Sequence, residues 1–344
     1  MKYLLLIFLT VTLCSYGLIP ESKEQVVIDR IEYIYNLKSL IDKDIWKGFA
    51  NIKYDLPLVY YTGSSCYISN PTEKFINRYK PVEIFNNKDL KIYKTPLLDS
   101  IPFHMSTGII LGDTTSDYNY RSPFMYASSF EITGNTIQDV NSTEQWATMI
   151  IHEYFHGFQY KHPAYLEYFE KNVVCIREDS LKKIYKSNSW FKEGIDKEND
   201  ILISAVHSTD YNEIKLLINT FFLQRERRRL LTTKKLHFDI KTTEEAYETM
   251  EGTARYVEYN LYRSFVVLHP DDKLAKSDSS YHSGDSFKNY KIEKDKWLYL
   301  TSKTSYFYAT GFNLARLLDK LKIEYKSRLF NEPGLSLEQI LKSY

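Results

Sequence analysis

The hydrophobic positions of the chain follow different periods in its two halves. Between Glu24 and Phe49, apolar residues recur every three to four positions, which predicts an amphipathic helix. Short apolar runs separated by Asn, Asp, Gly and Pro then follow, a pattern that favours strands. The expected strands are Leu56–Tyr61, Pro81–Phe85, Lys91–Lys94, Gly108–Leu111 and Phe124–Ile132. We therefore expect the first half to be rich in strands.

The pattern changes to the period of helices near Asn141. Ser142 is followed three residues later by Gln145, the spacing of a capping box at a helix start. Strands first and helices second indicate an α+β fold and not alternating βαβ units. The helices expected from this point are Thr143–Tyr160, Ala164–Asn172, Glu198–Ser208, Asn212–Leu231, Thr242–Leu261 and Thr310–Leu321.

The first of these helices contains the pattern His-Glu-x-x-His, from His152 to His156. Side chains four residues apart lie on one face of a helix, so the two imidazoles can bind one Zn²⁺ ion. Glu153 borders the same position and is expected to act as the general base that takes a proton from water. Apolar residues surround the pattern, which predicts a buried helix. A buried carboxylate flanked by two buried imidazoles is costly unless a metal ion compensates.

A catalytic zinc ion needs a third protein ligand besides an open position. The best candidate is Glu251, which precedes Gly252 on a later expected helix. Gly inside a helix costs about 1 kcal/mol relative to Ala, so we expect Gly252 to let this helix approach the helix of His152. Glu258 lies on the same face as Glu251 and also fits a carboxylate that orients a ligand histidine. Four nearby acids remain alternative ligands: Glu244, Glu245, Glu248 and Glu258.

His-Glu-x-x-His followed by Glu-Gly-x-Ala on a second helix resembles the gluzincin metallopeptidases, which include thermolysin-like enzymes and zinc aminopeptidases. The resemblance implies a zincin-like fold, a Zn²⁺ cofactor and hydrolysis of peptide bonds. It assigns His152, His156 and Glu251 to the metal and Glu153 to the proton transfer. The segment over 157–250 is longer than in typical members, and the Gly-x-Met-Glu-Asn motif of the aminopeptidases is absent.

A metallopeptidase also needs a donor that stabilises the oxyanion opposite the metal. The resemblance implies a Tyr or His from the C-terminal part of the chain. The candidates are Tyr308, Tyr306 and His282. The chain has 30 Tyr residues, so ordinary packing is the competing interpretation for each tyrosine.

Composition limits the domain organisation and the classes of partner. The 344 residues are 43% hydrophobic, enough for one large domain or two closely packed lobes. We expect a strand-rich lobe over 18–160, which ends in the helix of the two histidines, and a mainly helical lobe over 161–344. The net charge of +1 gives no electrostatic reason to expect nucleic acid as a partner.

A cluster of arginines on one expected helix is the strongest local concentration of charge. It consists of Arg225, Arg227, Arg228 and Arg229. A solvated helix face is the first interpretation. A narrower alternative is that one arginine binds a carboxylate of the substrate.

The first residues resemble a targeting segment. A positive start at Lys2 precedes the apolar run Leu4–Cys14, which predicts a signal peptide over 1–17 and a secreted or periplasmic protein. Lipid anchoring at Cys14 is the weaker alternative, because Leu13 is larger than that processing normally accepts. No later run is long enough for a transmembrane segment.

Two cysteines, Cys66 and Cys175, follow the predicted signal peptide. Outside the cytoplasm they can form a disulfide, but the sequence does not show whether they meet.

The sequence therefore predicts a secreted zinc-dependent peptidase that acts on a peptide or protein substrate. One alternative is a non-enzymatic binding protein on a zincin scaffold, which has no need of the base Glu153. The other alternative is a zinc hydrolase of a non-peptide amide or ester.

Overall fold

The structure is a computed structural model that describes residues 23–108, 124–173, 178–292, 299, 301 and 305–344. The predicted signal peptide over 1–17, with Cys14, lies outside the described residues. Cys175 and most of the strand expected over Gly108–Leu111 also lie outside them. Cys66 is a buried free thiol.

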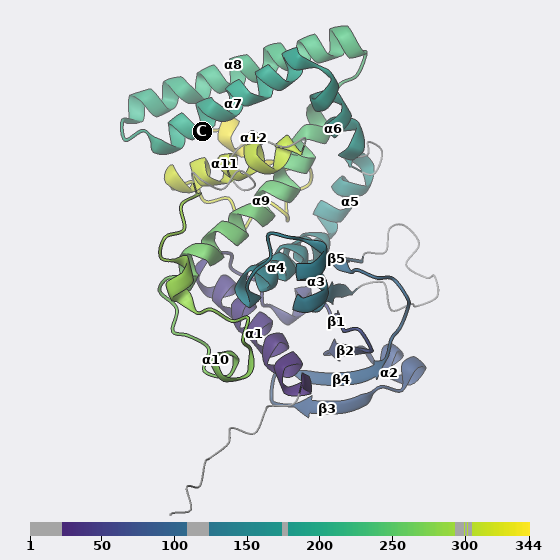
Figure 1. Ribbon diagram of the computed structural model, residues 1–344. Helices are drawn as coiled ribbons and strands as arrows, with labels where there is room; N and C mark the ends of the chain where they lie inside the picture. The colour runs from purple at the N-terminus through teal and green to yellow at the C-terminus, as the bar shows by residue number, and fades with distance from the viewer. Residues whose placement is uncertain (1–22, 109–123, 174–177, 293–298, 300, 302–304) are drawn as a thin grey trace, which may run out of the picture.

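A six-stranded mixed sheet forms one end of the molecule (Figure 1). Its strand order is β3-β4-β2-β1-β6-β5, with β1 and β6 parallel and the other neighbouring pairs antiparallel. The strands are β1 (Leu58–Tyr61), β2 (Ser65–Ser69), β3 (Val82–Asn86), β4 (Lys91–Pro96), β5 (Met105–Thr107) and β6 (Met125–Ser128). The edge strand β5 packs beside the helix of the two histidines.

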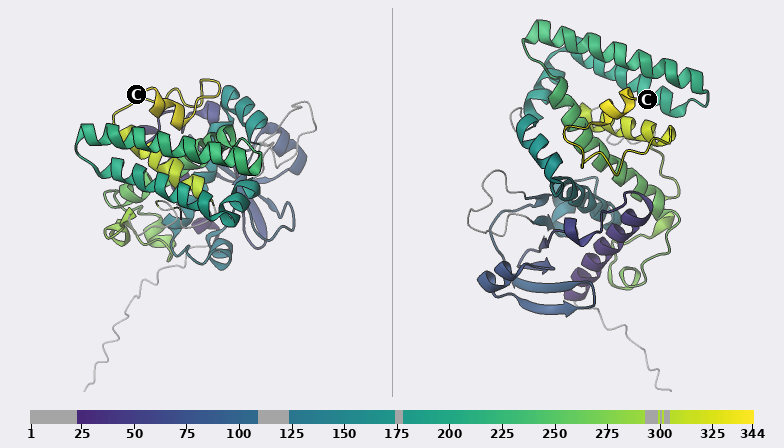
Figure 2. Two further views of the ribbon diagram at one scale, coloured as in Figure 1. Left: turned by 90° about the horizontal axis from the view of Figure 1, so that it is seen from above. Right: turned by 180° about the vertical axis from the view of Figure 1, so that it is seen from behind.

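Helices dominate the rest of the described chain, so the fold is α+β. Figure 2 shows α8 and α7 at the end opposite the sheet, with α9 running between the two ends. The α-helices are α1 (Lys23–Asp44), α2 (Glu73–Tyr79), α3 (Phe130–Thr136), α4 (Thr143–Tyr160), α5 (Pro163–Asn172), α6 (Glu178–Ser187), α7 (Ser189–His207), α8 (Tyr211–Leu236), α9 (Lys241–Phe265), α10 (Leu274–Ser277), α11 (Tyr306–Lys320) and α12 (Leu337–Lys342). Two short 3₁₀ helices span Ile52–Tyr54 and Gly284–Phe287. None of the described helices combines the length and apolar character needed to cross a membrane.

Strand β1 is buried on both faces of the sheet, because successive side chains of a strand point to opposite sides. Leu58 and Tyr60 join the main hydrophobic core, whereas Val59 and Tyr61 join a smaller core with Phe75 of α2. The main core also contains buried residues of α1, α4, α9 and α11. The sheet and the helices that carry the candidate site therefore share one core, which fixes their relative positions.

Helix α4 spans the predicted residues Thr143–Tyr160. Ser142 Oγ accepts a hydrogen bond from the Gln145 backbone N–H at 3.2 Å. The Gln145 side-chain oxygen in turn accepts one from the Asn141 N–H at 2.8 Å. The capping interaction predicted at this helix start is therefore confirmed, with its return bond made one residue earlier than in the usual box.

The strand prediction for Phe124–Ile132 is wrong at its C-terminal end. β6 ends at Ser128, and α3 begins at Phe130 because Ser129 Oγ caps the helix by accepting from the Ile132 N–H at 3.4 Å. α7 and α11 begin earlier than expected. The strands and α-helices that the pattern missed are β2, β5, α2, α3, α6, α10 and α12.

Three of the four clustered arginines are buried, so the expectation of a solvated face is wrong for them. Arg225, Arg228 and Arg229 are 1%, 3% and 9% exposed, whereas Arg227 is exposed. Their guanidinium groups donate hydrogen bonds to glutamates of three other helices. These carboxylates supply the negative charge that a buried guanidinium group needs. We call these residues the arginine–glutamate cluster; its acids are Glu198 of α7, Glu244 and Glu248 of α9, and Glu338 of α12.

Candidate metal centre

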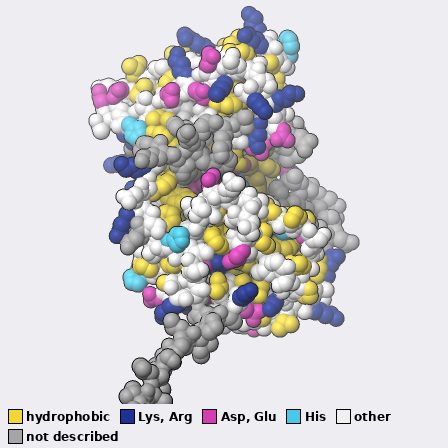
Figure 3. All heavy atoms as spheres, in the orientation of Figure 1, with side chains coloured by type: hydrophobic (Ala, Val, Ile, Leu, Met, Phe, Trp, Pro, Cys, Tyr) yellow, Lys and Arg dark blue, Asp and Glu magenta, His cyan; other side chains and the backbone are white. Residues whose placement is uncertain are grey.

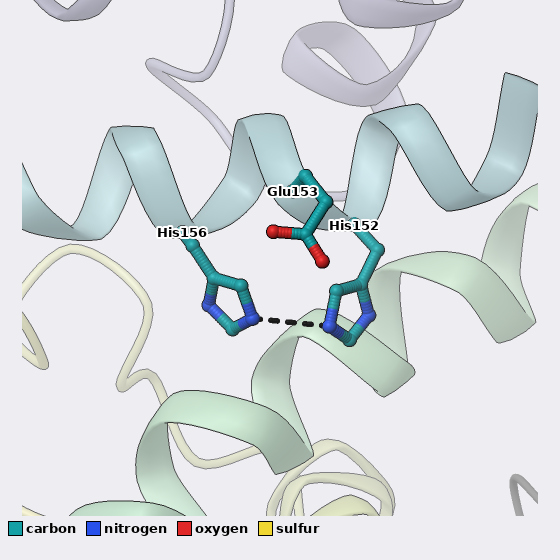
Figure 4. A group of neighbouring side chains, drawn as sticks. All are labelled: His152, Glu153 and His156. Carbon is teal, nitrogen blue, oxygen red and sulfur yellow. Dashed lines mark hydrogen bonds between the residues drawn. The ribbon is translucent and has the colours of Figure 1, made fainter. Parts of the chain in front are cut away.

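The structure brings the three predicted metal ligands together between α4 and α9. The Nε2 atoms of His152 and His156 lie 3.0 Å apart, joined by the dashed line in Figure 4. Glu251 Oε2, from α9, lies 3.3 Å from each of these two nitrogens. All three residues are buried. Two imidazoles and one carboxylate therefore direct one atom each at a common point.

This arrangement suits a divalent cation. Tetrahedral zinc with bonds of about 2.0–2.2 Å to N and O has neighbouring ligand atoms about 3.3–3.6 Å apart. The observed separations of 3.0 and 3.3 Å are close to that spacing. Glu251 Oε2 is buried and, while the two imidazoles are neutral, accepts no hydrogen bond from the described residues. A buried anionic oxygen without a donor is costly, and a cation at the common point would satisfy it.

Glu153 lies beside the same point, one residue after His152. Figure 4 shows its carboxylate over the gap between the two imidazoles. One ligand atom from each of His152, Glu153 and His156 lies within 4.8 Å of the others, so Glu153 itself competes as a third ligand. Glu251 fits that place better, because its oxygen lies 3.3 Å from both nitrogens. In this arrangement Glu153 lies beside the common point and is not one of the three ligands.

Both imidazoles have a polar partner close to their Nδ1 atoms, on the side away from the common point. His152 Nδ1 lies 2.7 Å from Glu258 Oε1. Arg255 donates to the other Glu258 oxygen at 2.6 Å. His156 Nδ1 lies 3.0 Å from the Gln159 side-chain oxygen, and the Gln159 amide donates to the Met250 carbonyl at 2.9 Å. Such partners fix the tautomer and orientation of metal-binding histidines.

The other acids considered as ligands point elsewhere. Glu244 and Glu248 accept hydrogen bonds from the arginines of α8. Glu245 accepts one from Ser336 Oγ at 3.0 Å. Glu258 contacts Nδ1 of His152 and so lies behind the imidazole, the orienting position that its sequence spacing allowed.

The charges around the common point favour a cation. Burial opposes the charged form of His152, yet Glu258 and Glu251 raise its pKa to about 9. Burial alone would raise the pKa of Glu251, but His156 and His152 hold that pKa well below its usual range. Both shifts show that the site stabilises positive charge.

Burial raises the pKa of the Glu153 carboxyl above its usual range, although His156 and His152 oppose the shift. A carboxylate with a raised pKa is a better proton acceptor at neutral pH than an ordinary glutamate. Glu153 is half-buried. It therefore has the position and the electrostatic environment expected of a general base.

Tyr308 is the C-terminal candidate that lies at the metal position. Its ring is stacked on that of His152, with centroids 6.3 Å apart and planes 13° apart. The Arg255 guanidinium lies 4.9 Å from the same ring. Tyr306 instead donates to Glu244 at 2.8 Å and so belongs to the arginine–glutamate cluster.

His282 lies near the start of α4 and not beside the two histidines. Its backbone N–H donates to Glu144 Oε1 at 3.0 Å. Glu144 precedes His152 by two helical turns, about 12 Å along the axis. The structure thus brings Tyr308 to the metal position and leaves His282 at the far end of the helix.

Gly252 has a packing role, but its partner is not the one expected. A Cβ added to Gly252 would lie 2.2 Å from the backbone carbon of Gly311 on α11, so the close approach is to α11 and not to α4. A Cβ at Gly311 would lie 2.1 Å from the Glu248 carbonyl oxygen. The two glycines let α9 and α11 touch, which brings Tyr308, one turn before Gly311, beside Glu251.

Tyr160 is a site residue that the sequence analysis missed. Its ring stacks on that of His156, with centroids 6.2 Å apart. Its hydroxyl donates to Met250 Sδ at 3.2 Å, and a thioether is a weak acceptor. Burial raises its pKa well above the usual range, and the carboxylates of Glu251 and Glu153 add to the shift. Its spacing, four residues after His156 on the same helix face, is the pattern that predicts this position.

No family model, curated protein or solved structure matches the chain. The chemistry of the site therefore follows from its own residues: two imidazoles and a carboxylate that converge, a second carboxylate beside them, and tyrosines on both histidine rings.

Proposed function

We propose that the protein is a secreted zinc-dependent peptidase of gluzincin type on a zincin-like fold. The observation that carries this proposal is the convergence of His152 Nε2, His156 Nε2 and Glu251 Oε2, with Glu153 beside them. These three residues would hold a Zn²⁺ ion, which when bound would act as a Lewis acid, lower the pKa of water and polarise a substrate carbonyl.

Glu153 carries the proton in this proposal. Its carboxylate takes a proton from the attacking water and returns it to the leaving amine. Its raised pKa supports this role. Structural zinc sites are usually closed by four protein ligands, whereas here three ligands and a base favour a catalytic site.

Tyr308 is the proposed donor to the oxyanion that forms on the substrate carbonyl. Its ring lies against His152, so its side chain borders the metal position. A preorganised donor of this kind acts only when negative charge develops on the oxygen. Glu258 and Gln159 have a positioning role, because they hold the two imidazoles at Nδ1.

The edge strand β5 favours an extended peptide as the substrate. β5 pairs with β6 on one side, and no strand of the described residues pairs with its other edge. Thr107 of β5 donates to the backbone carbonyl of Glu153, so this edge is tied to the turn of α4 that carries the base. An open edge can bind an extended peptide as an added strand, which supports peptides over compact esters.

The test is the substitution Glu153→Gln in purified protein loaded with zinc. A mixture of peptides is incubated with the wild type and the variant, and the products are identified by mass spectrometry. We expect the wild type to cleave peptide bonds and the variant to be slower by about 10²–10⁴-fold with unchanged zinc content.

Glu144→Gln is the matched control, because Glu144 is a buried glutamate of the same helix that contacts His282 and not the metal position. It should retain wild-type activity. Equal cleavage by the wild type and the Glu153 variant would show that Glu153 is not the base. A zinc-loaded wild type that hydrolyses small esters but no peptide bond would support the ester hydrolase, and one that hydrolyses neither would support the binding protein.

A further inference from the structure

Helix α8 lies at the end of the molecule opposite the sheet (Figures 1 and 2), and it exposes a line of leucines. Leu216, Leu223 and Leu230 are 66%, 58% and 65% exposed. They are three of the most exposed large apolar side chains in the described residues. In Figure 3, apolar side chains at this end stand among many Lys and Arg side chains.

The spacing of the three leucines places them on one face. Successive members are seven residues apart, and seven residues bring an α-helix back to within about 20° of the same direction. The opposite face of α8 is buried and carries Ile214, Ile218 and Phe221. The leucine line therefore runs along the outer side of the helix, away from the core of its own chain.

The residues on one flank of this line have opposite charges at the two ends of the helix. Glu213 lies near the start of α8, and Arg227 and Lys234 lie in its second half. All three are exposed. Glu213 also accepts a hydrogen bond from Ser208 Oγ, next to the helix start. An identical helix laid alongside in the opposite direction would bring the acidic end against the basic end.

We infer that α8 binds α8 of a second copy of this chain in an antiparallel pair. With Leu223 at the two-fold axis, Leu216 faces the partner's Leu230, and Glu213 comes within about one residue of the partner's Lys234. In a two-fold parallel pair this flank would face the partner's opposite flank, so Glu213 and the partner's Lys234 would not meet. The contact between Glu213 and the partner's Lys234 therefore requires the antiparallel dimer.

A single helix pair buries less than the roughly 1,200 Å² typical of stable complexes. The dimer is accordingly a weak one that responds to concentration. The surface is independent of the metal centre, since the leucines belong to α8 and the ligands to α4 and α9.

Sedimentation of the full chain over a range of about 1 µM to 1 mM tests this inference. The wild type should pass from monomer to dimer as the concentration rises. Leu223→Lys places two like charges at the axis and should raise the dissociation constant by at least about tenfold. Lys215→Glu is the control, because Lys215 is exposed on α8 but lies off the leucine line, and it should change the constant by less than about twofold.

Charge reversal tests the direction of the pair. Lys234→Glu should raise the dissociation constant by roughly fivefold, since two symmetric ion pairs become repulsions. The double variant Glu213→Lys with Lys234→Glu should return it to near the wild-type value. Thermal unfolding of each variant checks that α8 remains folded.

Three outcomes would overturn the inference. A wild type that stays monomeric over the whole range excludes the dimer. Dimerisation that Leu223→Lys leaves unchanged assigns it to another surface. Binding of the wild type to vesicles of phosphatidylglycerol, without self-association in solution, identifies a membrane as the occupant of the leucine line.

Discussion

The candidate metal centre and the arginine–glutamate cluster are two buried groups of charged residues, and α9 contributes acids to both. In the cluster, each carboxylate oxygen of Glu198, Glu244, Glu248 and Glu338 accepts at least one hydrogen bond, mostly from an arginine. At the candidate metal centre, Glu251 Oε2 faces two imidazole nitrogens and, while the two imidazoles are neutral, accepts no hydrogen bond from the described residues.

The difference separates a structural group of charges from a binding site. Carboxylates whose oxygens accept hydrogen bonds from donors of the same chain, mostly arginines, hold helices together and need no bound ligand. Acceptor atoms that converge without a donor are complete only when a proton or a metal ion is added. Burial and charge are alike in the two groups, and only the balance of donors and acceptors distinguishes them.

The largest expected effect comes from breaking the matched group. Arg225→Met removes hydrogen bonds to Glu198, Glu248 and Glu338. The substitution leaves Glu248 without an arginine donor among the described residues, whereas Arg228 and Arg229 still bond the other two. It should lower the free energy of unfolding by about 3–5 kcal/mol. Urea unfolding followed by circular dichroism measures the change.

The neighbouring exposed residue provides the control for that experiment. Arg227→Met makes the same chemical change on the solvent side of α8 and should alter the free energy of unfolding by no more than about 0.5 kcal/mol. Equal unfolding midpoints for the Arg225 and Arg227 variants would show that the cluster contributes nothing to stability.

A smaller effect is expected at the tyrosine that borders the metal position. Tyr308→Phe removes the proposed oxyanion donor and should lower kcat by about 10²–10³-fold, with zinc content unchanged. Tyr306→Phe is its matched control, since that hydroxyl donates to Glu244 in the arginine–glutamate cluster. Steady-state kinetics on one cleaved peptide compare the two. Similar losses of kcat in both variants would mean that Tyr308 acts through packing alone.

The smallest effect is expected when the residue behind a metal ligand is changed and the ligand itself is kept. Glu258→Gln keeps the size of the side chain but weakens its hold on His152 Nδ1. Zinc affinity should fall by about 10–100-fold, as is typical for such outer partners. Competition with a chromophoric chelator measures the affinity. A zinc affinity equal to that of the wild type would show that Glu258 does not contribute to metal binding.

The parts of the molecule that the sequence predicted are those set by local pattern. α4 follows from a cap and a sustained helical period, and the pairing of His152 with His156 follows from a spacing of four within that helix. Strand β5 was missed because three residues are too few for a period, and the polar Ser106 and Thr107 lack the apolar alternation of a strand.

Contacts between segments that lie far apart in the sequence could not be predicted from its local pattern. The burial of Arg225 depends on Glu198 and Glu338, which come from α7 and α12. Gly252 was predicted to mark a close helix approach, yet its partner helix depends on Gly311, which lies far along the chain. The nomination of Glu251 rested on the downstream Glu-Gly-x-Ala and the gluzincin resemblance, and the spacing of Glu258 already suggested an orienting role. Which acid faces the two Nε2 atoms could not be read from the sequence, because it depends on how α9 packs on α4.

The central claim is that Glu251, unlike the acids around it, completes a metal site. Elemental analysis of purified protein after incubation with zinc tests it directly, with the wild type compared with Glu251→Gln and Glu245→Gln. We predict one zinc per chain for the wild type and for the Glu245 variant, and loss or marked weakening of binding for the Glu251 variant. A folded wild type that takes up no zinc, or a Glu251 variant that keeps a full equivalent, would contradict the account.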